Sequence, residues 1–404
     1  MNEKNGQRKE LSDWLILSAL VERPIGETIR LFAEKLAASG VPVDRINCST
    51  FQRHQIMGAV DTTWERGRGD CKTEFVPKSF IANQSMFDTP AGYIARSQSI
   101  FERSNLRNAD ERAKFAAFKE LHDRGYSDYM ILKQSYGRDW AFRDTARDSE
   151  GVYGSFATKM DGGFSDDHIE EIKALWQTFA LCLKTSTEAL LSAKLMEAYV
   201  GTLAAQNILG GQVERGDGDS IKCVLWYSDL RGSTALSAEL PSDEYLELLN
   251  RYFDCTAGSV LEQGGEVLKL IGDGVMAIFP YDRGGEAEAC SSAMVAAQQS
   301  MAKAYDSQQE KDAGGTGNLH FGIGLHAGEV ILGNVGTAGR LDMTVTGHSV
   351  NQVTRLEALT KTLSMSVLAS PQFFELHKDN LISIGRYPVP DLGGMTEIFS
   401  LVEK

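Results

Sequence analysis

A short Gly-Asp-Gly segment between two apolar runs is the feature that most constrains how this chain folds. The runs from Glu266 to Ile271 and from Val275 to Phe279 are strand-like, and Asp273 lies between them in Gly272-Asp273-Gly274. Two such runs joined by a short glycine-containing turn indicate a β-hairpin. The hairpin would hold the Asp273 carboxylate at its tip, clear of the hydrophobic core.

A second aspartate stands in a similar setting. Asp229 follows an apolar run that begins at Cys223, and Leu230-Arg231-Gly232 follows it. We therefore expect both carboxylates at strand ends, where they would converge on a site for hard cations, which take oxygen ligands. A pair of such ions is what transfer of a phosphoryl group from a nucleoside triphosphate requires.

Bulk properties narrow the class of protein. The chain has 404 residues, which suggests two or three domains, and at 42% hydrophobic and 24% charged it can bury real cores. A net charge of -14 argues against a general nucleic-acid binder, which needs a basic field. No apolar run approaches ~20 residues and the N-terminus has no signal-peptide pattern, so we expect no membrane span and a cytoplasmic protein. The six scattered cysteines fit reduced thiols there.

The C-terminal half alternates between the two hydrophobic periods. The resulting order, β-α-β-β-α-β, predicts a ferredoxin-like core of the α/β (α+β) class. The strands and helices of this core are expected at 223–228, 241–262, 266–271, 275–279, 286–304 and 320–326, followed by a helix at 349–363.

The N-terminal half predicts a mixed α/β, sensor-like domain. Glycines at 210–218 mark a linker, so we expect a regulatory domain at 1–185, a helical linker at 186–218 and a catalytic domain at 219–404. Within the first domain we expect a polar, frayed N-terminus and an irregular segment at 60–110. The remaining elements expected there are a helix at 11–40 and strands at 41–46, 129–136 and 151–158. A long helix is expected to open at Gly162-Gly163-Phe164-Ser165-Asp166-Asp167, to have a break near Thr185-Ser186-Thr187 and to continue to about Leu209.

The motifs of residues 220–402 resemble the catalytic domain of class III nucleotidyl cyclases, in the family's order and spacing. Asp229 and Asp273 match the family's two metal aspartates, and the backbone carbonyl of Leu230 adds a ligand. The resemblance implies two Mg²⁺ or Mn²⁺ ions per active site. Either aspartate alone would be weak support, because turn-forming aspartates are common.

Three further residues match positions that the resemblance assigns to the substrate. Lys269 corresponds to a lysine that contacts adenine, where guanylyl cyclases tend to carry glutamate; a lysine can donate to N1 of adenine but not to the N1–H of guanine. Thr344 stands where many members have aspartate, and it is similar to the class IIIb subgroup, which has threonine. Arg340 is a candidate for the triphosphate.

Asn351 and Arg355 are four apart on the expected helix and therefore share one face. They match the family's transition-state residues, with Asn351 orienting the ribose and Arg355 neutralising charge on the α-phosphate and the leaving oxygen. One departure stands near the C-terminus. Pro390 and Asp391 fall where the family usually has a basic residue for the terminal phosphates, and Arg386 is a nearby substitute.

The resemblance implies an adenylate cyclase that converts ATP to cyclic AMP and pyrophosphate. In the family, one domain supplies the metal aspartates and its partner supplies the other residues, so a homodimer with active sites at the interface is implied. The region before the linker is weakly similar to a GAF-like sensor for an unknown regulatory ligand, which would make the protein part of signal transduction.

Two alternatives stay open at this point. The first is a guanylyl or pyrimidine nucleotide cyclase, for which Thr344 leaves room. The second is a catalytically silent, cyclase-like module for nucleotide binding or dimerisation, which Pro390 favours and the retained aspartates oppose. A Walker-type phosphate loop is excluded by the absence of its lysine motif, and His320, His326 and His348 fit no zinc spacing.

Overall fold

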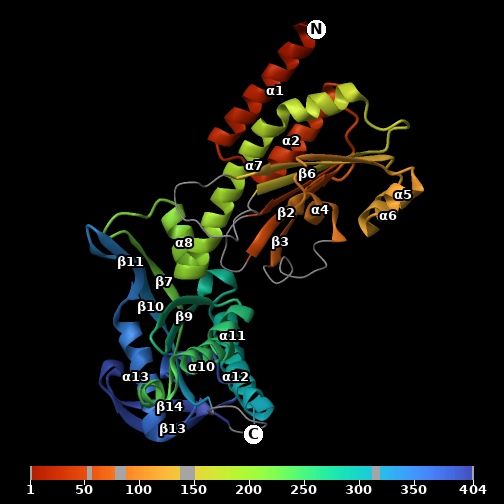
Figure 1. Cartoon of the computed structure of the whole chain (residues 1–404). Coiled ribbons are helices and arrows are strands. Elements are labelled where there is room, and N and C mark those ends of the chain that lie inside the picture. The colour runs from red at the N-terminus through yellow and green to blue at the C-terminus, as the bar shows by residue number, and fades with distance from the viewer. Residues whose placement is uncertain (1, 52–56, 78–87, 137–150, 312–318, 403–404) are drawn as a thin grey trace. The chain divides into compact units, whose positions relative to one another are not determined.

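A computed structural model describes residues 2–51, 57–77, 88–136, 151–311 and 319–402. The chain divides into two compact units, Met1–Leu195 and Met196–Lys404, and each contains a sheet with helices (Figure 1). The mixed α and β class expected from the sequence is confirmed.

The described part of the N-terminal unit is built on a six-stranded antiparallel sheet with the order β3-β2-β1-β6-β5-β4. Its strands are β1 (Arg45–Phe51), β2 (Met57–Glu65), β3 (Lys72–Pro77), β4 (Phe101–Asn105), β5 (Asp128–Ser135) and β6 (Gly151–Thr158). Because side chains alternate along each strand, the sheet has two different faces to cover.

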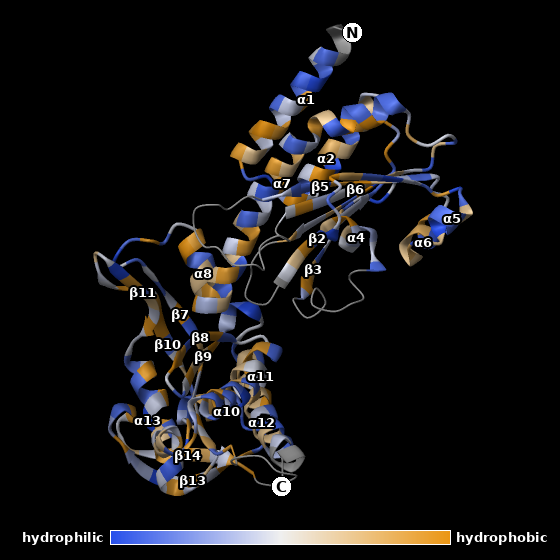
Figure 2. Cartoon of the chain, in the orientation of Figure 1, coloured by the Kyte–Doolittle hydropathy of each residue, from blue (hydrophilic) through white to orange (hydrophobic). Residues whose placement is uncertain are grey.

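Helices cover both faces of this sheet. Helices α1, α2 and α7 share one core with Ile46, Cys48 and Phe156, whereas α4 and α6 share a second core with Phe51 and Tyr129. The helices of this unit are α1 (Asn2–Leu20), α2 (Ile25–Ala38), α4 (Pro90–Arg96), α5 (Ala109–Arg112), α6 (Ala116–Asp123) and α7 (Asp166–Val200). In Figure 2, α1 is hydrophilic where it begins and apolar where it ends.

Several sequence expectations for this unit are wrong. The described residues of the segment 60–110 are largely regular, because β2 and β3 pair and α4 and β4 follow them, whereas 78–87 lie outside the described residues. The first ten residues are helical from Asn2, and Arg8 forms an ion pair with Glu171 at 2.7 Å. Helix 11–40 is interrupted before Pro24, which lacks the N–H that a continuous helix needs.

Helix α7 also runs without the break expected near Thr185-Ser186-Thr187. The hydroxyls of Thr185 and Thr187 donate to the carbonyls of Cys182 and Leu183, at 2.9 and 2.7 Å, within the same helix. Because these polar groups are satisfied inside the helix, they do not compete with its backbone bonds here. Helix α7 and α8 (Thr202–Leu209) occupy much of the predicted linker, and the domain boundaries at 185 and 218 stay predictions.

The described part of the C-terminal unit has an eight-stranded sheet, in which β13-β14-β12-β10-β7-β9-β8 are neighbours and β11 pairs with β10. The predicted β-α-β-β-α-β order is confirmed as β7, α10, β8, β9, α12 and β10. Strands of this sheet are β7 (Gly218–Leu230), β8 (Glu266–Ile271), β9 (Gly274–Pro280), β10 (Phe321–Thr337), β11 (Arg340–Thr346), β12 (Val367–Ala369), β13 (Leu381–Val389) and β14 (Gly394–Leu401).

Helices again lie on both faces. Val224 and Trp226 of β7 pack with α10, α11 and α12, whereas Cys223 and Leu225 pack with α8 and α13. Besides α8, the helices are α9 (Ser233–Glu239), α10 (Ser242–Cys255), α11 (Ala257–Glu262), α12 (Glu286–Lys311), α13 (His348–Leu363) and α14 (Pro371–Leu376), with short 3₁₀ turns at Tyr281–Arg283 and Pro390–Leu392.

Two further findings bear on the sequence expectations. Within the described residues, no helix combines the length and the apolar character that crossing a bilayer demands. All six cysteines are free thiols, five of them buried and Cys71 partly so.

Candidate active site

The β8–β9 hairpin predicted from the sequence is present. Ile271 pairs with Gly274, which leaves Gly272 and Asp273 as the two-residue loop. Gly272 has a φ of 63°, a conformation that a side chain disfavours, so glycine is required at this turn. The loop therefore presents Asp273 at the tip of the hairpin.

The hairpin tip lies against the end of β7. Asp229 pairs with Gly274 of β9 and with Gly322 of β10, and the next residue, Leu230, donates its N–H to the Asp273 carbonyl at 3.3 Å. The carboxyl groups of Asp229 and Asp273 are within hydrogen-bonding range of one another. The structure thus brings the two predicted metal aspartates together.

The electrostatics of this pair favour a cation. Burial, followed by the charge of Asp273, raises the pKa of Asp229 to about 6. Two adjacent carboxylates repel one another, and a divalent ion between them would relieve that repulsion. Among the described residues, no group of three or more His, Cys, Asp or Glu side chains is placed to hold a metal. Oxygens from the Leu230 backbone, water and substrate phosphates would have to complete the ligand set.

A third acid near this pair was missed by the sequence analysis. Glu357 of α13 is only 8% exposed, and burial together with the charge of Asp229 raises its pKa to about 7. A side chain on Gly322 would collide with Glu357 and Thr360, so this glycine permits the close approach of α13 to β10. The sequence feature that could have identified Glu357 is a glutamate at a position that the helical periodicity predicts to be buried.

The predicted substrate residues form a second cluster. Lys269 on β8 forms an ion pair with Asp342 of β11, two residues before Thr344. Thr344 is partly buried and pairs with Gly333 of β10. Arg340 is exposed at the start of β11, where it pairs with Thr337. Asp342 was not predicted, and its charge now satisfies the lysine that we expected to contact a base.

The predicted transition-state residues form a third cluster. Asn351 and Arg355 are exposed on the same face of α13, opposite the buried face that carries Glu357. Arg355 Nε donates to Asp391 Oδ2 at 3.4 Å, and Gln352 donates to the Asp391 backbone carbonyl at 2.6 Å. The acid that stands where the family usually has a basic residue thus pairs with the predicted catalytic arginine.

These clusters are separate within one chain. Among the described residues, no hydrogen bond or ion pair joins Asn351 or Arg355 to Asp229, Asp273 or Lys269. Arg386, the suggested substitute near Pro390, donates to the Met395 carbonyl at 2.8 Å. Among the described residues, the predicted metal-binding, base-binding and transition-state groups thus take part in separate sets of contacts.

The chain resembles known proteins over this same region. Residues 218–382 match the family described as the adenylate and guanylate cyclase catalytic domain. This part of the chain is a class III nucleotidyl cyclase catalytic domain.

Two of the curated relatives are named as adenylate cyclases. An adenylate cyclase of Anabaena cylindrica is 32% identical over 172 residues, which are 42% of this chain and 33% of that protein. Adenylate cyclase 1 of Rhizobium meliloti (strain 1021) is 32% identical over 147 residues, 36% of this chain and 22% of that protein. The match thus spans a third or less of these relatives.

Solved structures match over a similar share of the chain. The adenylyl cyclase CyaB from P. aeruginosa is 28% identical with a TM-score of 0.40, covering 46% of this chain and 97% of its own. The guanylyl cyclase Cya2 is 26% identical with a TM-score of 0.39, covering 46% of this chain and 94% of its own.

Proposed function

We propose that this protein is an adenylate cyclase that converts ATP to cyclic AMP and pyrophosphate. The observation that carries the proposal is the meeting of the Asp229 and Asp273 carboxyl groups at the end of β7. A silent, purely structural domain gains nothing from two repelling acids at one place. The lysine at position 269 favours adenine over guanine, because it can donate to N1 of adenine.

The reaction needs little covalent chemistry from the protein. The ribose 3′-oxygen bonds to the α-phosphorus, the bond from that phosphorus to the bridging oxygen of the β-phosphate breaks, and pyrophosphate leaves. Asp229, Asp273 and the Leu230 carbonyl would hold two Mg²⁺ or Mn²⁺ ions. Those ions would make the 3′-hydroxyl more acidic and neutralise the triphosphate. The protein's part is mainly to supply position and charge.

The remaining roles are divided between the other two clusters. Lys269 and Thr344 would hold the adenine ring, and Arg340 would contact the triphosphate. Asn351 would orient the ribose, and Arg355 would stabilise the charge that grows on the α-phosphate and the leaving oxygen. For this to happen, Arg355 has to leave Asp391 and Lys269 has to leave Asp342 when substrate binds.

We further propose a homodimer with both active sites at the interface. The predicted site residues fall into three sets with separate contacts, and a second copy related by a two-fold axis can supply one set to a site shared with the others. Exposed apolar side chains surround the base-binding cluster, as a self-associating surface requires. They are Leu270, Ile271, Ile331, Val335 and Leu341.

The N-terminal unit is proposed to regulate this activity. It has its own sheet and two cores, and it carries none of the proposed catalytic residues. Region 186–218 would act as a helical linker between regulatory and catalytic domains, and the GAF-like assignment stays a prediction. ATP as substrate and six free thiols fit a cytoplasmic setting.

The test is product analysis of the purified full chain with ATP, GTP, CTP and UTP, each with Mg²⁺ or Mn²⁺. We expect cyclic AMP and pyrophosphate from ATP, with kcat/KM at least about tenfold above that for GTP, a difference of about 1.4 kcal/mol. Cyclic GMP as the main product would establish the guanylyl alternative. Intact triphosphates under every ion would overturn the proposal and leave the silent module.

A further inference from the structure

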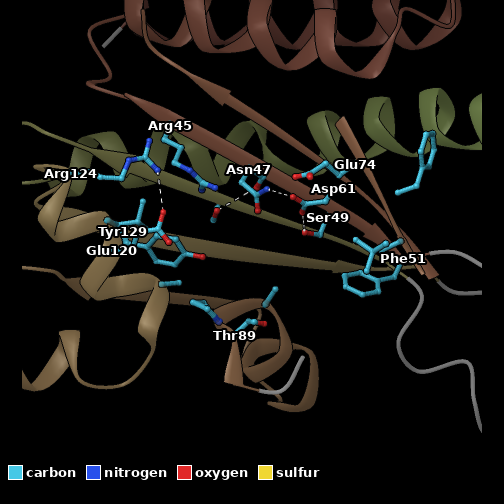
Figure 3. A pocket seen from close by; sticks show the side chains of 18 of the residues that line it. Arg45, Asn47, Ser49, Phe51, Asp61, Glu74, Thr89, Glu120, Arg124 and Tyr129 are labelled. Carbon is cyan, nitrogen blue, oxygen red and sulfur yellow. Dashed lines mark hydrogen bonds and ion pairs between the residues drawn. The ribbon is translucent and has the colours of Figure 1, made fainter. Parts of the chain in front are cut away.

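The N-terminal unit contains a cavity of about 490 Å³ between its sheet and the helices α4 and α6. That volume is within the range of small-molecule sites, which is roughly 300–1,000 Å³. Figure 3 shows Arg45, Asn47, Ser49 and Phe51, all from alternate positions of β1, directed toward this space. The cavity lies wholly within one unit of the chain.

One wall of the cavity is polar in a way that a hydrophobic core does not need. Asp61 of β2 accepts hydrogen bonds from Asn47 Nδ2, at 2.8 Å on Oδ2, and from Ser49 Oγ on Oδ1 (Figure 3). Ser155 of β6, only 3% exposed, lines the same wall and donates to the Asn47 carbonyl at 3.5 Å. Polar groups on the covered face of a sheet cost stability unless they are matched.

The charge of Asp61 is uncompensated. Both of its hydrogen-bond partners are neutral, and among the described residues no Lys, Arg or His forms an ion pair with it. Each carboxylate oxygen can accept two hydrogen bonds and receives one from the described residues, which leaves one position on each oxygen unused by them. Two parallel acceptors suit a ligand head that offers two N–H groups side by side, as an amidine or guanidine does.

The arginines that line the cavity are already engaged. Arg124 pairs with Glu65 at 2.5 Å and with Glu120 at 3.7 Å, and Arg45 Nε lies 3.6 Å from Glu65. Glu65 is buried and also pairs with Arg68, so it gathers these guanidinium groups at one end of the wall. Within the part of the chain that the structure describes, Asp61 is therefore a charged group of the wall without an ion-pair partner.

The cavity also has an apolar lining, supplied by the sheet and by the helices that cover it. The apolar lining side chains include Phe51, Ala59, Phe75 and Val76 from the sheet and Pro90, Ala91 and Leu121 from α4 and α6. This surface would bury a hydrocarbon or aromatic body while the head reaches the polar wall.

We propose that this cavity binds a small amphipathic cation, with an amidine- or guanidine-like head on Asp61 and an apolar body against Phe51 and Leu121. The site is independent of the proposed cyclase chemistry, because it uses none of its residues. It assigns the N-terminal unit a class of ligand by charge, shape and hydrogen-bond pattern.

The test uses three probes of one shape and different charge: benzamidine, benzamide and benzoate. Binding to the full chain is followed by ligand-observed NMR and calorimetry. We expect benzamidine to bind with a dissociation constant on the order of millimolar, as a small fragment does, and at least about tenfold more tightly than benzoate. Asp61→Asn should weaken benzamidine binding about tenfold, because it removes a charge-assisted pair of hydrogen bonds.

The matched control is Glu74→Gln. Glu74 lines the same cavity and pairs in register with Asp61, but it is exposed and already bound to Lys72 at 2.8 Å, so benzamidine affinity should change less than about twofold. Asp273→Ala should keep full benzamidine binding, which excludes the catalytic unit as the site. Circular dichroism checks that the variants fold. Equal binding of benzoate, or full binding by folded Asp61→Asn, would overturn the proposal.

Discussion

The two units place carboxylates on their sheets in opposite ways. In the N-terminal unit, Asp61 lies on a covered sheet face and receives hydrogen bonds from the neutral Asn47 and Ser49. In the C-terminal unit, Asp229 lies at a strand end beside another acid, and its pKa is raised to about 6 by burial and by Asp273. In the first arrangement, the Asp61 carboxylate is positioned to accept hydrogen bonds from the cationic head group of the proposed ligand. In the second arrangement two acids lie side by side, and we propose that divalent cations balance their charge.

The largest effects should follow from changes to the proposed catalytic site. We expect Asp273→Ala and Arg355→Ala each to lower kcat at least about 100-fold, because each removes charge stabilisation from the transition state. Assays of cyclic AMP formation measure this. Neither change should affect benzamidine binding to the N-terminal unit, which would keep the two sites distinct.

Mixing these two variants sharpens the result. If active sites are shared between copies, a mixed dimer regains one intact site, and an equal mixture should recover about a quarter of the normal activity. Chains with both substitutions, added to the inactive partner, are the control and should recover none. No recovery in the mixture, with dimers present, would contradict sites at an interface.

The next effect concerns stability. Glu357 has a pKa raised to about 7 by burial, so its ionised form is disfavoured in the folded state. The contribution of Glu357 to stability should be fully present below about pH 4.5 and be lost as the pH rises through 7. Without divalent ions, Glu357→Gln should therefore stabilise the C-terminal unit at pH 8 by about 2 kcal/mol and raise its Tm by about 4 °C.

The same substitution should have little effect at pH 5, where Glu357 is already protonated in the fold. Thermal unfolding at the two pH values measures the difference. Glu375→Gln, in the same unit, is the control. A shift of the same size at both pH values would show that packing, and not charge, explains the effect of Glu357.

A smaller change is expected at the base-binding cluster. Lys269→Ala should raise KM for ATP about tenfold, because it removes a charged hydrogen-bond donor to the ring. Lys378→Ala, an exposed lysine of the same unit, is the comparison and should leave KM unchanged. Steady-state kinetics with ATP decide between them. An unchanged KM for Lys269→Ala would show that Lys269 forms the ion pair with Asp342 and does not contact the substrate.

The smallest effect is expected at Asp391. Its ion pair with Arg355 is 3.4 Å long and largely exposed, so it is worth under about 1 kcal/mol. Asp391→Asn should free Arg355 and raise kcat/KM about twofold, while Gln352 still holds the backbone of residue 391. Asp379→Asn is the matched control. A loss of activity would mean that Asp391 positions Arg355 instead of restraining it.

The secondary structure of the C-terminal unit was predicted well from the sequence, because the features that determine it depend on residues that are close together in the chain. Strand periods, the Gly-Asp-Gly turn and the helix at 349–363 each depend on neighbours in sequence, and the structure has all of them. The meeting of Asp229 with Asp273 followed from strand ends that share one edge. By contrast, the ion pairs of Lys269 with Asp342 and of Arg355 with Asp391 join distant segments. The sequence shows which residues are charged, but it does not show which of them form ion pairs with one another.

The N-terminal unit was harder to predict for a related reason. Most of β2 and all of β3 lie in the segment 60–110, which was read as irregular because of glycines and charges such as those in Arg66-Gly67-Arg68-Gly69-Asp70. Strand pairing between β2 and β3 joins residues across this turn, and the periodicity of a single strand does not reveal it. Asp61 of β2 is one of the residues that line the cavity.

The state of the thiols has a practical consequence. Burial raises the pKa of each of the six cysteines, so little reactive thiolate exists near neutral pH. The cysteines of the folded chain should therefore resist alkylation and air oxidation, and hydrogen peroxide should react slowly with these thiols. We therefore do not expect oxidants to regulate this protein through its cysteines.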